Sequence, residues 1–203
     1  MTYSAAEAYL SQRDPVMATI IADNYPLHPR ASRGDDYFSS LVRTIVGQQV
    51  STHSAAATFA RFQEVSQLDP TLVLQLPDEQ LRAAGLSRQK IRYIRELARH
   101  FVQQPDIFMH LESLSDEAVV QQLTKILGIG VWSAQMFLLF TLTRADVFAP
   151  GDRGLQLAID RHYPVEQPRT PAEYAIVAER WQPHRSTASR YLWESLNNTP
   201  RGE

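Results

Sequence analysis

Cysteine is absent from this sequence of 203 residues. The absence excludes a disulfide scaffold, a zinc site with cysteine ligands and a cysteine-ligated iron–sulfur cluster. Proteins without disulfides commonly work inside the cell, and we expect this one to be intracellular.

Long apolar runs are also absent. The longest lies at 136–142 and is far too short to cross a bilayer, which needs about 20 residues. Residues 1–15 lack the basic start and the apolar run of a signal peptide. We therefore expect no membrane partner.

An excess of positive charge is missing as well. The 20 Lys and Arg residues and the 22 Asp and Glu residues give a formal net charge of −2. A protein that coats nucleic acid usually has a basic face. Any binding of an anion must therefore depend on local placement of basic side chains or on backbone N–H groups. Only two of the basic residues are lysines, Lys90 and Lys125.

The alternation of apolar and polar residues that marks a half-buried strand is missing too, and nearly every segment has a helical pattern. We predict an all-α fold. Polar caps and breaks at Gly and Pro divide the chain into predicted helices. These lie near 4–10, 16–23, 37–46, 51–62, 69–74, 77–84, 87–101, from 115, and at 131–142, 153–163, 171–181 and 184–197.

The most informative stretch of the chain is Lys125–Ala134, which reads as two helices joined by a very tight turn. Gly128 and Gly130 flank one apolar residue, Ile129. Glycine permits a positive φ and the close approach of another backbone, so we expect both positions to require glycine. The N–H groups that open the second helix form an anion site that suits a phosphate group.

An isolated acid, Asp152, follows the break at Pro150 and Gly151. One interpretation is a helix N-cap, since a helix is predicted to begin at Arg153. The other is a catalytic carboxylate, because the tight turn upstream suggests chemistry on a nucleic acid. The two roles are compatible. A rival acid, Asp146, is expected to anchor the connecting loop.

Five blocks, in order and at family spacing, resemble the helix-hairpin-helix DNA glycosylases, and most of all their 3-methyladenine DNA glycosylase II branch. They extend over about 37–195. The blocks are Leu41-Val42-Arg43-Thr44-Ile45-Val46-Gly47-Gln48-Gln49-Val50-Ser51, Gly85-Leu86-Ser87 with Lys90, Leu127-Gly128-Ile129-Gly130 with Trp132-Ser133-Ala134, Asp146-Val147-Phe148 with Pro150 and Asp152, and Glu179-Arg180-Trp181 with Pro183, Arg185, Ser186 and Trp193.

The resemblance implies two helical subdomains with a helix-hairpin-helix DNA-binding motif and an active-site cleft between them. The central subdomain would comprise 37–142, and the second would combine 1–36 with 143–203. It also implies that Asp152 is catalytic, by stabilising the oxocarbenium-like sugar as the base leaves.

Roles for the DNA-binding residues follow from the same resemblance. The phosphate would bind at Gly128, Gly130 and Val131, and Gln49 would fill the gap left by the flipped base. A monovalent cation would bind the main-chain carbonyls of the hairpin, and no cofactor would be required. Those carbonyls belong to Thr124, Ile126 and Gly128.

The base pocket implied by the resemblance contains Trp132, Trp193, Met136 and Tyr37. Core packing is the competing interpretation of Trp132, and the alkylation branch often has Tyr where this chain has Met136. Trp132 also stands where bifunctional relatives carry a nucleophilic lysine. Because Trp cannot form a Schiff base, we expect base release without strand cleavage.

The function implied is a monofunctional DNA N-glycosylase of base-excision repair. It would hydrolyse the glycosidic bond of alkylated purines of the 3-methyladenine and 7-methylguanine type. We expect a monomer acting on damaged double-stranded DNA in the cytoplasm or nucleoid, or in a eukaryotic nucleus. Two alternatives remain: a glycosylase for oxidised, deaminated or mismatched bases in the same fold, and a non-catalytic module that binds damaged DNA.

Overall fold

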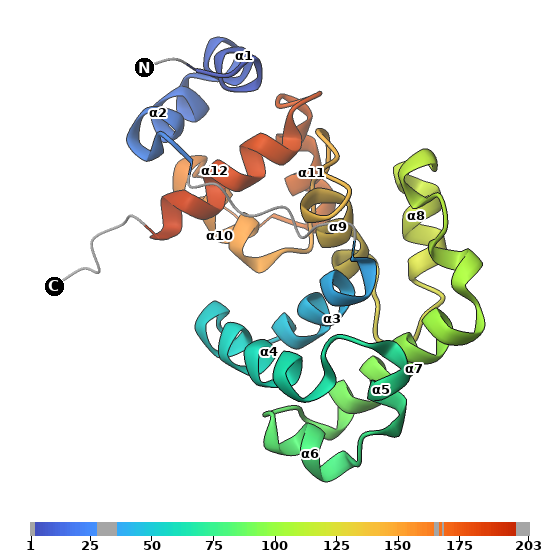
Figure 1. Cartoon of the computed structure of the whole chain (residues 1–203). Coiled ribbons are helices and arrows are strands. Elements are labelled where there is room, and N and C mark those ends of the chain that lie inside the picture. The colour runs from blue at the N-terminus through green and yellow to red at the C-terminus, as the bar shows by residue number, and fades with distance from the viewer. Residues whose placement is uncertain (1–2, 28–35, 165–166, 168, 198–203) are drawn as a thin grey trace, which may run out of the picture. The chain divides into compact units, whose positions relative to one another are not determined.

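The computed structural model describes residues 3–27, 36–164, 167 and 169–197 (Figure 1). Every regular element within these ranges is a helix, which confirms the predicted all-α class. The elements are α1 (Ala5–Arg13), α2 (Pro15–Asn24), α3 (Tyr37–Gly47), α4 (Thr52–Ser66), α5 (Pro70–Gln75), α6 (Asp78–Ala83), α7 (Arg88–Gln103), η1 (Pro105–Phe108), η2 (Leu111–Ser113), α8 (Asp116–Leu123), α9 (Val131–Phe140), α10 (Arg153–His162), α11 (Pro171–Glu179) and α12 (Arg185–Asn197).

The chain divides into two compact units. Unit 1 combines Met1–Arg30 with Thr143–Glu203, and unit 2 is Ala31–Leu142. None of the described helices combines the length and the apolar character needed to cross a membrane.

Unit 2 is built around α3, whose apolar residues recur at spacings of three and four. Leu41, Val42 and Ile45 are fully buried, and α3 packs against α4, α7 and α9. Burial of each such side chain contributes roughly 1.5–3 kcal/mol. The packing fixes the position of the C-terminal end of α3, and with it the start of the segment that follows.

Side-chain caps set where the helices begin. The Ser51 hydroxyl accepts a hydrogen bond from the N–H of Ser54, and Ser87 and Ser115 cap α7 and α8 in the same way. These starts match the sequence prediction. The helix α4 continues to Ser66, beyond its predicted end, because the residues after Phe62 are compatible with helix; it closes at Gln67, whose φ is +50°.

Unit 1 is held together partly by the buried carboxylate of Asp14, which caps α2. One oxygen accepts hydrogen bonds from the N–H groups of Val16 and Met17, at 2.9 and 3.2 Å. The other accepts from the Tyr163 hydroxyl at 2.7 Å and from the Trp181 indole N–H at 3.0 Å. Burial raises the pKa of the Asp14 carboxyl, but these four donors outweigh it and hold the pKa below its ordinary value.

Candidate nucleic-acid interface and acid site

The tight turn predicted at 125–130 connects α8 to α9. Two of its N–H groups donate to carbonyls three residues earlier, Ile126 to Leu123 at 3.1 Å and Ile129 to Ile126 at 3.0 Å. The side chains of Ile126 and Ile129 are buried, whereas Leu127 and Val131 are 44% and 56% exposed. The turn is therefore anchored from within and presents its outer edge to solvent.

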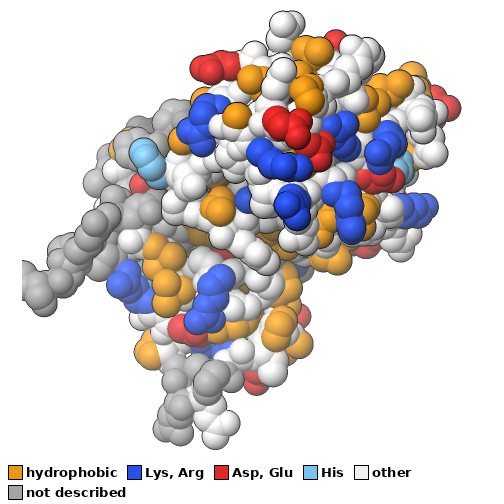
Figure 2. Space-filling view, turned by 90° about the horizontal axis from the view of Figure 1, so that it is seen from below, with side chains coloured by type: hydrophobic (Ala, Val, Ile, Leu, Met, Phe, Trp, Pro, Cys, Tyr) orange, Lys and Arg blue, Asp and Glu red, His pale blue; other side chains and the backbone are white. Residues whose placement is uncertain are grey.

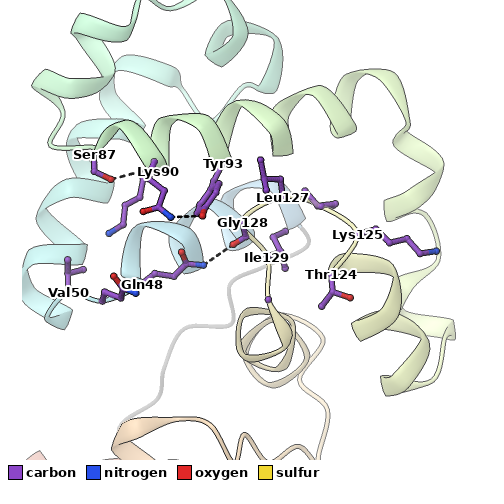
Figure 3. A pocket seen from close by; sticks show the side chains of 14 residues that line it. Gln48, Val50, Ser87, Lys90, Tyr93, Thr124, Lys125, Leu127, Gly128 and Ile129 are labelled. Carbon is purple, nitrogen blue, oxygen red and sulfur yellow. Dashed lines mark hydrogen bonds between the residues drawn. The ribbon is translucent and has the colours of Figure 1, made fainter.

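Gly128 has a structural reason to be glycine. Its φ is +94°, and a Cβ atom built there would lie 2.6 Å from the Cβ of Tyr93 on α7. The ring of Tyr93 therefore packs directly on the backbone of the hairpin (Figure 3). Only a residue without a side chain satisfies both conditions.

Gly130 does not need glycine for its conformation, and the expectation that it does was wrong. Its φ is −92° and its ψ is 178°, an extended conformation open to any residue, and no atom lies within 4 Å of a Cβ built there. As the N-cap of α9 it provides no side-chain hydrogen bond to the first turn. The N–H groups at this helix start are thus not capped by the residue before them.

A groove of about 730 Å³ lies beside the hairpin. Both lysines of the chain line it, and no acidic residue does. Figure 2 shows one face of the molecule, on which basic side chains are interspersed with acidic and apolar ones. The groove is therefore locally basic although the chain is net negative. Its lining residues are Gln48, Gln49, Val50, Ser87, Gln89, Lys90, Tyr93 and Thr124–Gly130.

The segment after α3 forms the opposite edge of the groove (Figure 3). The side-chain amide of Gln48 donates to the Gly128 carbonyl at 2.9 Å and to the Ser133 hydroxyl at 3.1 Å. Gln49 is exposed and has a φ of +58°. Its side chain thus stands at the surface on a backbone held in the left-handed region, which non-glycine residues adopt infrequently.

Two of the three hairpin carbonyls predicted as cation ligands accept hydrogen bonds within the protein. The Ile126 carbonyl accepts from the N–H of Ile129, and the Gly128 carbonyl accepts from Gln48. Each carbonyl has two lone pairs, so both retain one. Binding of a monovalent cation by these two carbonyls and that of Thr124 therefore stays a prediction. No cluster of three or more His, Cys, Asp or Glu side chains suited to a metal occurs among the described residues.

Asp152 caps α10 in unit 1, as its position in the sequence predicts. Its Oδ1 atom accepts a hydrogen bond from the N–H of Leu155 at 2.8 Å and one from the Trp193 indole N–H at 2.9 Å. The residue is only 9% exposed. A nearly buried carboxylate at the positive end of a helix, with a second donor on the same oxygen, is held in a fixed orientation.

Gly154 makes the contact between Asp152 and Trp193 possible. A Cβ atom at this position would lie 3.0 Å from Cδ1 and 3.1 Å from Nε1 of Trp193, and 3.1 Å from Oδ1 of Asp152. A larger residue would force the indole or the carboxylate to move by about a few tenths of an ångström. Sequence analysis missed Gly154, and its only signal was its place two residues after the acid.

The remaining pocket candidates lie in unit 2. The Tyr37 hydroxyl donates to Glu112 at 3.0 Å, and its ring meets Phe137 of α9 edge to face. Met136 is 4% exposed, and Trp132 is half-buried.

The rival acid Asp146 accepts a hydrogen bond from the Nε of Arg185 at 2.8 Å, which confirms that it anchors the loop.

Comparison with known proteins gives one family. Residues 42–183 match the model of the HhH-GPD superfamily of base excision DNA repair proteins. DNA-3-methyladenine glycosylase 1 of Schizosaccharomyces pombe is 29% identical over 199 residues, covering 94% of this chain and 86% of that protein. The structure of the S. pombe 3-methyladenine DNA glycosylase Mag1 in complex with abasic DNA is similar, with a TM-score of 0.89 at 25% identity. That similarity covers 98% of this chain and 100% of that one.

Another relative is considerably longer than this chain. The protein YfjP of Bacillus subtilis is 29% identical over 168 residues, which cover 78% of this chain. The chain spans 58% of the length of that protein.

Proposed function

The chain belongs to the HhH-GPD superfamily of base excision DNA repair proteins, and we propose that it is a monofunctional DNA N-glycosylase that releases alkylated purines. The observation that carries the proposal is the oriented carboxylate of Asp152, bonded to the α10 N-terminus and to Trp193. The S. pombe relative supports the substrate class, since it is named a DNA-3-methyladenine glycosylase.

The proposed chemistry is hydrolysis of the bond between the sugar and the base. A purine alkylated at N3 or N7 is cationic and leaves as a neutral base, so the leaving group needs little help. Positive charge develops on the sugar instead, and a fixed carboxylate stabilises that charge. Asp152 supplies the carboxylate, and a water molecule then attacks the sugar carbon.

The proposed handling of DNA divides between the hairpin and the segment after α3. N–H groups near Gly130 and Val131 take a phosphate, and the two lysines of the groove add positive charge beside it. Gln49, exposed at the edge of the groove, fills the gap left by the extruded base and so offsets part of the unstacking cost.

The proposed preference for cationic bases rests on aromatic side chains. The face of an indole or phenol ring attracts a cation. In the proposal, Tyr37 and Trp132 of unit 2 and Trp193 of unit 1 supply such rings, and Met136 of unit 2 adds an adaptable apolar side chain. Oxidised or deaminated bases are neutral and would gain less from these residues.

We propose that no cofactor is needed and that the enzyme acts as a monomer on double-stranded DNA in the cell's DNA-containing compartment. A monovalent cation held by the hairpin carbonyls would supply positive charge toward a phosphate. We propose that the enzyme does not cleave the DNA strand. Trp132 offers no amine, and the Lys90 ammonium donates to the Val46 carbonyl at 2.7 Å.

A base-release assay tests the proposal. DNA treated with a methylating agent, and duplexes containing 8-oxoguanine, hypoxanthine or a mismatch, are incubated with the protein, and released bases are identified by chromatography. We expect 3-methyladenine and 7-methylguanine, and no covalent adduct after borohydride treatment. Release confined to oxidised or deaminated bases would support the alternative substrate class, and binding without release would support a non-catalytic module.

A further inference from the structure

We propose that Gln48 is a positioning residue that ties the base-displacing segment Gly47–Val50 to the hairpin. The inference rests on the proposed function, in which Gln49 fills the gap in the DNA. It assigns Gln48 a role separate from that of its neighbour, which the sequence analysis did not predict.

The first observation is the direction of the Gln48 side chain. It is partly buried, and its Nε2 atom donates to two groups on different parts of the hairpin. One is the carbonyl of Gly128 in the turn, and the other is the hydroxyl of Ser133 in the first helical turn of α9. Gln48 therefore bridges the turn and the helix that follows it. Figure 3 shows its bond to Gly128. Gln49, in contrast, is exposed.

The second observation is that α7 holds the same segment from another side. The Lys90 ammonium donates at 2.7 Å to the carbonyl of Val46, in the last turn of α3. A cation at a helix C-terminus is favourable, and the hydrogen bond satisfies a carbonyl that has no partner within the helix. Burial lowers the pKa of Lys90, so the ammonium meets this carbonyl in a partly desolvated setting.

The third observation is that α7 also contacts the hairpin, so that α3, α7 and the hairpin are all in contact with one another. Tyr93 on α7 packs on Gly128 of the hairpin, as described above. Lys90 joins α7 to α3, Tyr93 joins α7 to the hairpin, and Gln48 joins the hairpin to the end of α3. Three elements joined in pairs cannot shift independently. The hairpin and the segment bearing Gln49 thus keep a fixed spacing.

The fixed spacing matters because extrusion of a base costs a few kcal/mol of stacking and pairing. A side chain that fills the gap offsets this cost best when it is already in place. Gln49 has a left-handed backbone, so an unanchored segment would relax away from this conformation. Loss of the Gln48 amide should therefore impair base extrusion more than DNA binding or bond cleavage.

The experiment uses Gln48→Met, which keeps the length of the side chain and removes its donor. Single-turnover base release is measured with saturating enzyme on two substrates. One carries the methylated base in a fully paired duplex, and the other carries it in an unpaired bulge, where extrusion costs less. Gln121→Met, on the exposed face of α8, is the matched control.

We expect Gln48→Met to be about tenfold slower on the paired duplex, the effect of losing about two ordinary hydrogen bonds, and within twofold of wild type on the bulge. Gln121→Met should match wild type on both. An equal loss on both substrates would overturn the proposal, because it would indicate damage to folding or chemistry. An unchanged rate on both would overturn it as well.

Failure of the proposed function gives a different result, namely wild-type protein that releases no methylated base from either substrate. The role of Gln48 is then measured with a duplex that carries 2-aminopurine opposite an abasic analogue. The fluorescence of 2-aminopurine rises when this base is unstacked. A smaller rise with Gln48→Met than with wild type at saturating protein supports the inference. An equal rise overturns it.

Discussion

At the scale of single residues, Asp152 joins a structural role and a proposed chemical one. The same oxygen atom that caps α10 also accepts the indole N–H of Trp193. Because both donors fix the carboxylate before any substrate arrives, its electrostatic effect needs no reorganisation during the reaction. Trp193, expected from the sequence to form a pocket wall, holds the carboxylate of Asp152 by this hydrogen bond.

Substitution of the acid should separate catalysis from binding. Asp152→Asn keeps an oxygen for the N–H of Leu155, so α10 should remain capped. We expect base release from 3-methyladenine DNA to fall at least about 100-fold, in line with the loss of one preorganised electrostatic group. Affinity for a duplex with an abasic analogue should change by less than about threefold, as measured by fluorescence anisotropy. Near-normal turnover would remove Asp152 from the catalytic role.

Gly154 provides a finer test of the same contact. Gly154→Ala places a methyl group against Trp193 and Asp152 and should lengthen their hydrogen bond. A hydrogen bond to a charged group contributes about 1.5–3 kcal/mol, and a lengthened bond loses part of this, so base release should slow by up to about tenfold.

The matched control for this variant is Gly151→Ala, since no atom lies within 4 Å of a Cβ at Gly151. Single-turnover rates of the two variants, with circular dichroism to check folding, make the comparison. Equal rates for Gly154→Ala and wild type would mean that the indole contact does not position the acid.

At the scale of elements, the two glycines of the hairpin are under different structural constraints. The fold itself requires glycine at position 128, because φ is positive there and the ring of Tyr93 leaves no room for a side chain. Gly130 has no such internal reason. Space beside the backbone that the protein itself does not fill is available to a partner that approaches closely, and a phosphate bound at the start of α9 is such a partner.

Stability and DNA affinity should therefore respond oppositely at Gly130. Gly130→Asp and Gly130→Asn both introduce good N-cap residues, so each should raise the free energy of unfolding, by about a few tenths of a kcal/mol. The aspartate alone adds a negative charge where the phosphate docks. We expect Gly130→Asp to bind duplex DNA at least about tenfold more weakly than Gly130→Asn, with or without damage, because phosphate contacts carry no sequence information.

Urea unfolding and fluorescence anisotropy at one fixed salt concentration measure the two effects. If Gly130→Asp and Gly130→Asn bound DNA equally well, the start of α9 would not be a phosphate site, and the hairpin would be only a structural turn.

At the scale of the whole molecule, segments far apart in the sequence are joined by a few buried polar groups. In unit 1, Asp14 near the N-terminus accepts hydrogen bonds from Tyr163 and Trp181. The pKa of Tyr163 is raised, first by burial and then by its bond to this carboxylate. The network links the N-terminal helices to the C-terminal part of the unit, so its charge state bears on global stability.

The stability that Asp14 contributes should depend on pH. Its folded pKa lies below the unfolded value of about 3.9, so the contribution is present above that value and is lost as the pH falls through the folded pKa. Asp14→Asn does not titrate and disrupts the pairing with Tyr163 and Trp181. We expect it to lower the free energy of unfolding by about 1–3 kcal/mol at pH 7.

The difference between wild type and Asp14→Asn should shrink when unfolding is measured below pH 4. Urea denaturation at pH 7 and at pH 3 gives the comparison. A difference that stayed constant or grew on acidification would contradict the proposed role of the ionised carboxylate.

The helical class, most helix starts and the position of the tight turn could be predicted from the sequence. These features depend on local chemistry: Asp36, Ser87 and Asp152 cap helices through backbone atoms a few residues away, and periodic apolar residues define which face is buried. The tertiary structure decided what local patterns cannot encode. The contacts of Gln48 with Gly128, of Tyr93 with Gly128 and of Trp193 with Asp152 join residues that are 35 or more positions apart. Their formation depends on how the helices pack, so only the folded chain reveals that Gln48 faces the hairpin and that Gly130 is free of internal constraint.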